Sequence, residues 1–336
     1  MSTPTQEKAA PLVSVIIPAY NAEKYISDTL SSILNQTVSD LEIIVCDDCS
    51  SDATVEVVNS FDDPRIRLIK NEINLGYIKT TNLLLREATG LFVAPQDADD
   101  ISASTRFEKQ LAVFANNSSI QLIFTNGLMF TNYGEIRLLP RRGNQELTIQ
   151  SQEATLMPSV MMRRAIIAEF SGFNEYFGRL SSMDRYYYME ILEKHKGYFL
   201  DEILYFARMA PGSHSKSLSA DKRKLIIYEV YLFLKNQRIK TGTDYLKEKD
   251  FASLRLLEEN LLKNKNLLYE RTLEHATWSV DAYNIQDYFK LAKNLFWTNP
   301  FNLKQYRLAF YALRNVFKRK PLEKKPVLKG SGLDFV

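Results

Sequence analysis

Two aspartates separated by one residue are the strongest candidates for chemistry in this sequence. Asp97-Ala-Asp99-Asp100 follows an apolar run that starts at Gly90-Leu-Phe-Val. Mg²⁺ and Mn²⁺ prefer one or two carboxylates together with phosphate oxygens of a substrate. At the end of a buried strand, one carboxylate can therefore hold a metal while the other binds a ribose hydroxyl. The spacing suits a nucleoside diphosphate, although Asp-rich turns without a ligand are also common.

Further polar residues follow two earlier apolar runs, namely Asn21, Asp47, Asp48 and Asp52. Carboxylates that gather without a neighbouring Lys or Arg repel one another, and a bound divalent cation relieves that repulsion. The alternative is helix capping, which Asp47, Asp48 and Asp52 could each perform alone. The sequence thus predicts an acidic rim and leaves open which of its members bind a ligand.

The elements that must position this rim alternate between strand and helix. Apolar β-branched runs predict strands, the first ended by Pro18, and spacings of three and four residues predict helices. The predicted strands cover 13–17, 41–45, 65–69 and 91–94, and the predicted helices 25–34, 52–60 and 76–88. Such alternation is typical of an α/β fold with a mostly parallel sheet, whose ligands bind beyond the carboxyl ends of the strands.

The rest of the chain changes character twice. Residues 116–215 are less regular, with a strand at 121–124 among Gly, Pro and Asn turns, and we expect them to extend the same domain. From 216 onward helical spacing dominates. We therefore divide the chain into a disordered N-terminus (1–11), an α/β domain (12–215) and a helical C-terminal region (216–336).

The order of four motifs across residues 12–115 resembles the family 2 glycosyltransferases of the GT-A fold. These motifs are Val15-Ile-Ile-Pro-Ala-Tyr-Asn21, Val45-Cys-Asp-Asp-Cys-Ser-Ser-Asp52, Asn74-Leu-Gly76 with Asn82, and Asp97-Ala-Asp-Asp100. The resemblance implies a nucleotide-diphospho-sugar transferase fold. It makes 12–115 the nucleotide half and 116–215 the acceptor half, names that we use below.

The resemblance also implies roles for individual residues. Nucleotide-sugar contacts fall to Pro18, Ala19, Tyr20, Asn21, Asp47, Asn74, Gly76, Asn82, Asp97, Ala98 and Arg208. Within that set, Asp47 contacts the base and Asp97 the ribose. Asp99 holds Mn²⁺ or Mg²⁺ at the diphosphate, and Arg208 stabilises the diphosphate charge.

The acceptor half contains a second group of family-like motifs. Gly172-Phe-Asn-Glu175, followed by Asp184-Arg-Tyr-Tyr-Tyr188, resembles the family's acceptor segment, in which an Asp is the general base. Asp184 takes that role by resemblance, and stabilising a helix N-terminus is the competing interpretation. Met183 stands where the family usually has Glu.

A second departure from the family lies at 208–213. The family's Arg-x-His-x-Gly-Ser is present as Arg208-Met-Ala-Pro-Gly-Ser213, so Ala210 replaces a histidine. His214 either substitutes for that histidine through a shifted loop or is a surface residue. Its position in sequence does not decide between them.

Composition excludes several function classes. Lys and Arg total 43 and Asp and Glu 40, a net charge of +3 that gives no reason to expect a nucleic-acid partner. The two cysteines, Cys46 and Cys49, exclude a disulfide framework and indicate a reducing, cytoplasmic compartment. Neither a signal peptide nor an apolar run of membrane-spanning length is found, so we expect no transmembrane helix.

The C-terminal tail carries a concentrated positive charge. Residues 301–330 contain nine basic residues and one acidic residue. Leu303, Tyr306, Phe310, Leu313 and Phe317 recur at helical spacing between the basic residues, with Phe296 and Trp297 just before them. Residues 301–325 resemble a helix that lies on an anionic membrane surface. The alternative is a terminal helix docked on the protein with its charges in solvent.

The family resemblance implies an inverting glycosyltransferase that uses a nucleotide diphosphate sugar, UDP-linked, and a divalent metal. The acceptor is a glycan or lipid-linked glycan of a surface polysaccharide, at the cytoplasmic face of a membrane. The alternative is an inactive nucleotide-sugar-binding or scaffold protein recruited to a membrane. Met183 and Ala210 favour that alternative, whereas intact Asp97, Asp99 and Asp184 count against it. The sequence specifies neither the sugar nor the oligomeric state.

Overall fold

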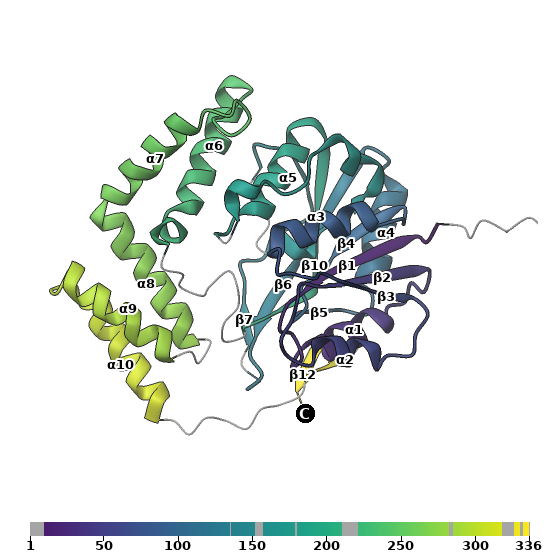
Figure 1. Ribbon diagram of the computed structural model, residues 1–336, viewed down its shortest axis with the longest axis horizontal. Helices are drawn as coiled ribbons and strands as arrows, with labels where there is room; N and C mark the ends of the chain where they lie inside the picture. Colours follow the sequence, from purple (N-terminus) through teal and green to yellow (C-terminus); the bar gives the residue numbers. More distant parts are fainter. Residues whose placement is uncertain are drawn as a thin grey trace, which may run out of the picture.

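The computed structural model describes residues 10–134, 136–151, 157–178, 180–209, 221–281, 285–317, 326–329 and 332–335 (Figure 1). Its first half alternates strand and helix as the sequence predicts. The elements are β1 (Val13–Ala19), α1 (Ile26–Leu34), β2 (Leu41–Asp47), α2 (Thr54–Asn59), β3 (Ile66–Lys70), α3 (Tyr77–Glu87) and β4 (Phe92–Pro95).

One boundary in this half is predicted wrongly. We expected Pro18 to end the first strand, yet β1 continues to Ala19 and Pro18 pairs with Cys46 of β2. The pairing of β1 with β4 stops at Ile16. Beyond Ile16, β4 therefore offers no acceptor for a backbone N–H at position 18. The missing N–H of Pro18 costs no sheet hydrogen bond for this reason.

The sheet is mixed, with a parallel nucleotide half. Its order is β3-β2-β1-β4-β9-β6-β10-β5, and β1 to β4 pair in parallel. Short strands β5 and β9 pair antiparallel with their neighbours, whereas the long strands β6 and β10 pair in parallel. The further strands are β5 (Ile101–Ser102), β6 (Ile120–Phe130), β7 (Ile136–Leu138), β8 (Gln145–Leu147), β9 (Met161–Arg163) and β10 (Lys196–Arg208).

Each face of the sheet carries its own core. Val13, Val15 and Ile17 point to the face covered by α1 and α4 (Arg106–Asn116). Ile16 points to the other face, which α3 and α5 (Met183–Lys194) cover. This alternation is the period of two that a strand buried on both sides requires.

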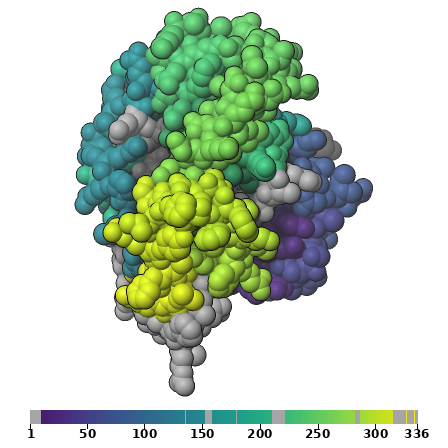
Figure 2. Space-filling model, turned by 90° about the vertical axis from the view of Figure 1, so that its left-hand side faces the viewer, coloured from purple at the N-terminus to yellow at the C-terminus, as the bar shows by residue number. Residues whose placement is uncertain are grey.

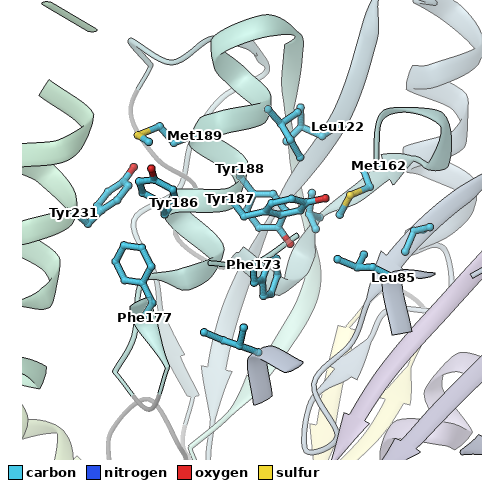
Figure 3. Close-up of a cluster of buried hydrophobic side chains, with 14 of the residues drawn as sticks. Leu85, Leu122, Met162, Phe173, Phe177, Tyr186, Tyr187, Tyr188, Met189 and Tyr231 are labelled. Atoms are coloured by element: carbon cyan, nitrogen blue, oxygen red, sulfur yellow. The ribbon is translucent and has the colours of Figure 1, made fainter. Parts of the chain in front are cut away.

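The second core continues beyond the sheet. Tyr186, Tyr187 and Tyr188 of α5 pack with Phe173 and Phe177, and Figure 3 shows these rings gathered between the sheet and the C-terminal helices. Val230, Leu234 and Leu254 belong to the same cluster. They come from α6 (Ile227–Thr241) and α7 (Phe251–Lys263). The first C-terminal helices are therefore packed into the α/β core, and the expected boundary near 216 lies outside the described residues.

The last three helices form a separate cluster. Helices α8 (Lys265–Asp281), α9 (Ile285–Thr298) and α10 (Leu303–Phe317) pack around Ala276, Leu291 and Leu308. The helix expected over 301–325 is thus present as α10, and 318–325 lie outside the described residues. No helix in the described part of the chain is both long and apolar enough to cross a bilayer.

A short hairpin follows and is absent from the prediction of a wholly helical C-terminal region. Strands β11 (Pro326–Lys329) and β12 (Gly332–Phe335) pair antiparallel, and Leu333 packs beside the core under β1 and α1. Each strand has four residues. Runs this short carry too few periods to be recognised by hydrophobic spacing.

Candidate active site

The predicted rim residues meet at the carboxyl ends of β1, β2 and β4. Ala19 and Asp47 are the last residues of their strands and lie opposite each other in the parallel ladder. The backbone N–H of Asp48 donates to the carbonyl of Ala19 at 2.8 Å. Asp97 and Asp99 lie in the turn between β4 and β5. The sheet therefore brings both acidic motifs to one edge, as expected.

Asp47 holds an acceptor that the protein does not use. The residue is only 3% exposed, and its Oδ2 accepts the backbone N–H of Ser50 at 3.1 Å. Its Oδ1 is buried without a hydrogen-bond partner among the described residues. Buried polar atoms are nearly always paired in native proteins. The unpaired oxygen is thus ready to accept a hydrogen bond from a ligand.

In Asp48, the next residue, both carboxylate oxygens accept hydrogen bonds from the protein. Its Oδ1 accepts the backbone N–H of Leu75 at 2.8 Å, and its Oδ2 accepts that of Gly76 at 2.8 Å. Asn74 donates from its side chain to the carbonyl of Asp48 at 3.1 Å, and Asn71 donates to Oδ1. The predicted wall residues Asn74 and Gly76 are therefore joined to Asp48, which holds the loop between β3 and α3.

The loop after β1 is tied to the loop after β2. The Oδ1 of Asn21 accepts the backbone N–H of Ser51, and its own N–H donates to the Oγ of Ser50, both at 2.9 Å. Asn21 and Cys49 both have positive φ, 49° and 63°. Tyr20 is 53% exposed beside this tie. An exposed ring of this kind could stack on a planar base.

Asp52 orders the chain before α2 without being its N-cap residue, which is Ala53. Asp52 accepts the backbone N–H of Thr54 at 3.1 Å through Oδ1 and that of Glu23 at 3.1 Å through Oδ2. It therefore orders the start of α2 and the turn before α1. Cys46 is buried, Cys49 is exposed, and both are free thiols.

The Asp97 turn brings three carboxyl groups close together. Asp97 and Asp99 are partly exposed and Asp100 is buried. Burial first, and then the charge of Asp99, raise the pKa of Asp97 to about 7, although a hydrogen bond from the Tyr77 hydroxyl to its Oδ1 at 3.1 Å opposes the shift. Burial and the two neighbouring aspartates raise the pKa of Asp100. An added cation would lower the free energy of this arrangement.

Arg208 lies beneath this turn. Its side chain is 1% exposed and forms an ion pair with Asp28 of α1 at 2.9 Å. The Nε donates to the carbonyl of Asp99 at 2.7 Å, and the backbone N–H of Arg208 donates to the Oδ1 of Asp100 at 2.8 Å. Another hydrogen bond reaches Asn132. These contacts hold the turn in place, and a direct contact of Arg208 with a diphosphate stays a prediction.

Ala98, between the two aspartates, is held from α1. Its carbonyl accepts a hydrogen bond from the Thr29 hydroxyl at 2.9 Å, and the same hydroxyl donates to the carbonyl of Asp100 at 2.9 Å. Together with Arg208, Thr29 fixes the backbone that carries both carboxylates. A fixed backbone keeps the two carboxylates at a constant separation.

Asp184 lies close to the same turn although it comes from another element. It stands in the first turn of α5, and its Oδ1 accepts the backbone N–H of Arg185 at 2.7 Å. Burial is the main reason for the raised pKa values of Asp97 and Tyr77, and the charge of Asp184 adds to both. The predicted base is thus near the predicted ribose contact. A role at the helix N-terminus is compatible with this position.

The start of α5 has an unusual backbone. Ser182, which precedes the helix, is buried and has a left-handed φ of 66°. Non-glycine residues rarely adopt this conformation, and such strain tends to occur at functional sites. Met183 packs partly against the core, so no carboxylate occupies the position where the family has Glu.

Asn82 joins α3 to the acceptor half. Its Nδ2 donates to the carbonyl of Phe173 at 2.9 Å, and its Oδ1 accepts the N–H of Phe173 at 2.7 Å. Gly172 has a φ of +85°, and a Cβ there would lie 2.4 Å from the Oδ1 of Asn82. The glycine therefore permits a contact that a larger residue would block. A place for Asn82 in the wall of the nucleotide pocket stays a prediction.

Three residues that the sequence did not single out support the site. Tyr77 donates to Asp97, and the Tyr205 hydroxyl accepts the backbone N–H of Asp97 at 3.2 Å. Arg106 is fully buried with its guanidinium 5.0 Å from the Tyr205 ring, and burial lowers its pKa to about 10. Tyr77 could have been found as the residue after Gly76. The sequence does not indicate that Arg106 is buried, because an Arg at the start of an amphipathic helix is usually exposed.

A divalent cation fits the residues that are present. No group of three or more His, Cys, Asp or Glu in the described ranges is arranged to hold a metal ion. A cation would therefore depend on one or two carboxylates and on phosphate oxygens, which is the usual arrangement for Mg²⁺. Asp99 suits this because burial raises the pKa of its carboxyl even though Arg208 opposes the shift, so a bound cation would stabilise the charged carboxylate. Ala210 and His214 lie outside the described residues.

An α/β domain with an acidic turn at the carboxyl edge of its sheet is typical of nucleotide-binding proteins, and comparisons with known proteins identify the family. A family model described as Glycosyl transferase family 2 matches residues 14–170. The chain is 30% identical to "Putative glycosyltransferase EpsE" of Bacillus subtilis over 66% of its own length and 79% of that protein. The chain belongs to glycosyl transferase family 2.

A second curated relative matches over a shorter stretch. The chain is 41% identical to the Escherichia coli "UDP-Glc:alpha-D-GlcNAc-diphosphoundecaprenol beta-1,3-glucosyltransferase WfgD" over 36% of its own length and 47% of that protein. The alignment thus spans less than half of WfgD. The 121 aligned residues are about as many as the nucleotide half contains.

Solved structures agree on the fold. S. aureus TarS 1-349 in complex with UDP-GlcNAc matches with a TM-score of 0.58 at 19% identity, covering 97% of this chain and 96% of that one. Mannosyltransferase PcManGT from Pyrobaculum calidifontis, in complex with GDP-Man and Mn²⁺, matches with a TM-score of 0.50 at 15% identity, covering 93% and 88%. The fold is that of the GT-A glycosyltransferases, with a helical C-terminal region.

Proposed function

We propose that this glycosyltransferase is an inverting, metal-dependent enzyme that moves a sugar from a UDP-sugar to a hydroxyl of a glycan or lipid-linked oligosaccharide. The observation that carries the proposal is that Asp184, from the acceptor half, acts electrostatically on Asp97 of the nucleotide half. A carboxylate on the acceptor side and a carboxylate pair on the nucleotide side then face one reaction space.

The nucleotide would be held at the edge of β1 and β2. The unpartnered Oδ1 of Asp47 would accept a ring N–H of the base, and the exposed ring of Tyr20 would stack on it. Asp97 would accept a hydrogen bond from a ribose hydroxyl. A divalent cation, when bound at Asp99, would offset the negative charge that develops on the departing diphosphate.

The acceptor hydroxyl would lose its proton to Asp184. As the acceptor oxygen forms a bond to the anomeric carbon, the bond from that carbon to the diphosphate oxygen breaks and its electron pair leaves with the nucleoside diphosphate. Attack opposite the leaving group inverts the configuration. A positioned base of this kind contributes about 10² to 10⁴ in rate.

The relatives support the finer parts of the proposal. WfgD is named for a UDP-Glc donor and a diphosphoundecaprenol-linked acceptor, and TarS was crystallised with UDP-GlcNAc. Another relative is named for teichuronic acid biosynthesis, which favours a surface polysaccharide such as capsule, O-antigen or exopolysaccharide. The complex of PcManGT with GDP-Man and Mn²⁺ supports the metal and makes GDP-sugars a necessary control.

We place the enzyme in the cytoplasm, at the cytoplasmic face of a membrane where a lipid-linked acceptor would be reached. Two free cysteines suit a reducing compartment.

The test is release of nucleoside diphosphate from a panel of UDP-, GDP- and dTDP-sugars with Mn²⁺ or Mg²⁺, each repeated with a chelator. Slow hydrolysis of the nucleotide sugar needs no acceptor. We expect release from one UDP-sugar that the chelator abolishes. Release that the chelator leaves unchanged would contradict the metal requirement, and release from a GDP-sugar alone would contradict the nucleotide.

Variants assign the metal role. Asp99→Asn should weaken metal-dependent nucleotide-sugar binding strongly, whereas Asp62→Asn, an exposed aspartate after α2, is a matched control that should change nothing. Equal metal dependence in Asp99→Asn and the parent would contradict the assignment.

The second candidate is a binding protein without turnover. It is favoured by Met183, which packs toward the core where the family has a carboxylate. Tight metal-dependent binding of a UDP-sugar, without transfer to lipid-linked glycans in cell extracts, would establish that alternative.

A further inference from the structure

Helices α9 and α10 expose an unusual amount of apolar surface. Trp297 is 75% exposed and Phe310 is 72% exposed. We call the surface around them the α9–α10 face, which comprises Phe289, Phe296, Trp297, Leu303, Phe310 and Leu313. Exposed apolar patches of this kind usually mark an interaction site.

These side chains lie opposite the packed sides of the same helices. Leu295 and Leu308 are buried in the cluster with α8. Two residues further along, Trp297 and Phe310 lie about 200° around their helices, since each residue turns a helix by about 100°. A helix that is apolar on opposite sides is normally covered on both. The described residues cover only the side that faces α8.

The uncovered side is visible at the surface of the molecule. Figure 2 shows α9 and α10, in yellow, facing the viewer with no other described segment in front of them. In Figure 1 they lie on the far side of α8 from the sheet. The α9–α10 face is therefore open to an external partner.

Basic residues outnumber acidic ones along α9 and α10, by five to one. Between Tyr288 and Phe317 the chain has five basic residues and no acidic one. Two of the five have acidic neighbours, because Lys290 pairs with Asp287 and Lys304 with Glu270. The other three, Lys293, Arg307 and Arg314, are exposed and form no ion pair with described residues.

These three cations border the apolar side chains. Lys293 lies about 40° around α9 from Trp297, while Arg307 and Arg314 lie about 60° and 40° around α10 from Phe310. Cations beside aromatic and aliphatic side chains match an anionic bilayer, where charged headgroups overlie acyl chains. A second copy of the chain is less suitable, since it would set these cations against their own counterparts.

We propose that the α9–α10 face docks on an anionic membrane surface, with its apolar side chains in the headgroup region and Lys293, Arg307 and Arg314 on lipid phosphates. The proposal goes beyond the transferase reaction and does not depend on it. It also moves the contact from the tail expected at 301–325 to two helices that include α9.

The experiment is co-sedimentation of the full chain with vesicles of phosphatidylcholine alone or mixed with phosphatidylglycerol. We expect binding to the mixed vesicles only, and we expect salt to weaken it. Changing Lys293, Arg307 and Arg314 to Glu should reduce affinity by at least roughly 100-fold, since each basic residue near an anionic surface contributes a factor of roughly five and each new carboxylate adds repulsion. Changing Trp297 and Phe310 to Ser should reduce it roughly 10-fold or more.

Matched variants on α7 and at the start of α8 control for general effects. Leu256 is 58% exposed on α7, and Leu256→Ser removes an apolar group elsewhere. Changing Arg255, Lys263 and Lys265 to Glu reverses three exposed charges outside the face. Both control variants should bind vesicles like the parent. Far-UV circular dichroism and thermal melting should show that every variant remains folded.

Two results would overturn the proposal. One is vesicle binding that is absent, or equal in the face variants and their controls. The other is a dimer, seen by analytical ultracentrifugation, that the Trp297 and Phe310 changes dissociate, because a second copy would then cover the face. Nucleotide-sugar hydrolysis without vesicles should be equal in all variants, so failure of the membrane proposal and failure of the transferase proposal give different results.

Discussion

The nucleotide half and the acceptor half hold their carboxylates in different ways. Asp47 and the Asp97 turn follow regular parallel strands directly, and their geometry comes from the sheet. Asp184 instead begins a helix whose position depends on side-chain packing. The ring of Tyr187 lies 5.0 Å from that of Phe173, and Tyr186 lies 5.3 Å from Phe177.

The C-terminal region takes part in that packing. Arg238 of α6 is almost fully buried and donates to the Tyr186 hydroxyl at 2.7 Å. The same guanidinium pairs with Asp244, which is completely buried. Helix α5, and with it Asp184, is therefore fixed by a region far along the chain. The carboxylates of the nucleotide half are thus positioned by local backbone, and Asp184 is positioned by tertiary contacts. Mutations in the two halves should therefore have different effects on stability, nucleotide-sugar binding and turnover.

The largest effect is expected from Asp184→Asn. Loss of the base should lower kcat by about 10² to 10⁴, while the Kd for the nucleotide sugar stays near that of the parent because the nucleotide half is untouched. Single-turnover transfer and isothermal titration measure the two quantities separately. A matched change outside the site, Asp62→Asn at an exposed position after α2, should retain activity. Full activity of Asp184→Asn would refute the assignment of the base.

Breaking the buried ion pair comes next. Arg238→Met leaves the charge of Asp244 buried without its partner, and removing one member of such a pair costs about 3 to 5 kcal/mol of unfolding free energy. Urea denaturation followed by circular dichroism measures the loss. Arg255→Met, at an exposed position of α7, should change the unfolding free energy by less than about 0.5 kcal/mol. Equal stability of the two variants would show that α6 does not support α5.

The same contrast explains what could be predicted from sequence. In the nucleotide half, each acidic motif directly follows a strand that its own apolar residues reveal, so the strands, the helices and the convergence of Asp47 with Asp97 and Asp99 were all predicted. The extent of β1 past Pro18 was not, because it depends on where β4 stops pairing.

Tertiary roles were out of reach. Nothing near Asp48 in sequence shows that its carboxylate holds the loop before Tyr77, and nothing near Arg106 shows that it is buried. Asp184 was found only through family resemblance. Its closeness to Asp97 arises from packing between segments separated by most of the acceptor half. Such contacts leave no periodic signal in the chain.

Two adjacent aspartates offer a smaller and sharper test within the nucleotide half. Asp48→Asn sets an amide against the N–H groups of Leu75 and Gly76 and should cost about 2 to 3 kcal/mol of stability. Asp47→Asn should leave stability almost unchanged, since its Oδ1 has no partner among the described residues, yet should weaken nucleotide-sugar binding. Urea denaturation and titration with UDP distinguish the two. Equal stability losses would mean that Asp47 is structural as well.

The smallest effect is expected where the two halves meet. Gly172→Ala places a methyl group against Asn82 in a left-handed backbone, which costs about 1 to 2 kcal/mol for a non-glycine residue. Gly143→Ala is the matched control, because a Cβ there meets nothing within 4 Å. Since the link from Asn82 to Phe173 joins α3 to the acceptor segment, kcat should fall more than affinity for the nucleotide sugar.

A double-mutant cycle decides whether that link matters. In an Asn82→Ala background the methyl group at 172 has no amide to displace, so Gly172→Ala should then cost only its backbone strain, and the two changes should be non-additive. Additive effects on kcat would mean that Asn82 and Gly172 act independently. In that case the position of the acceptor half would depend on the tyrosine core and α6 alone. The nucleotide half, through Asn82, would then contribute nothing to the placement of Asp184.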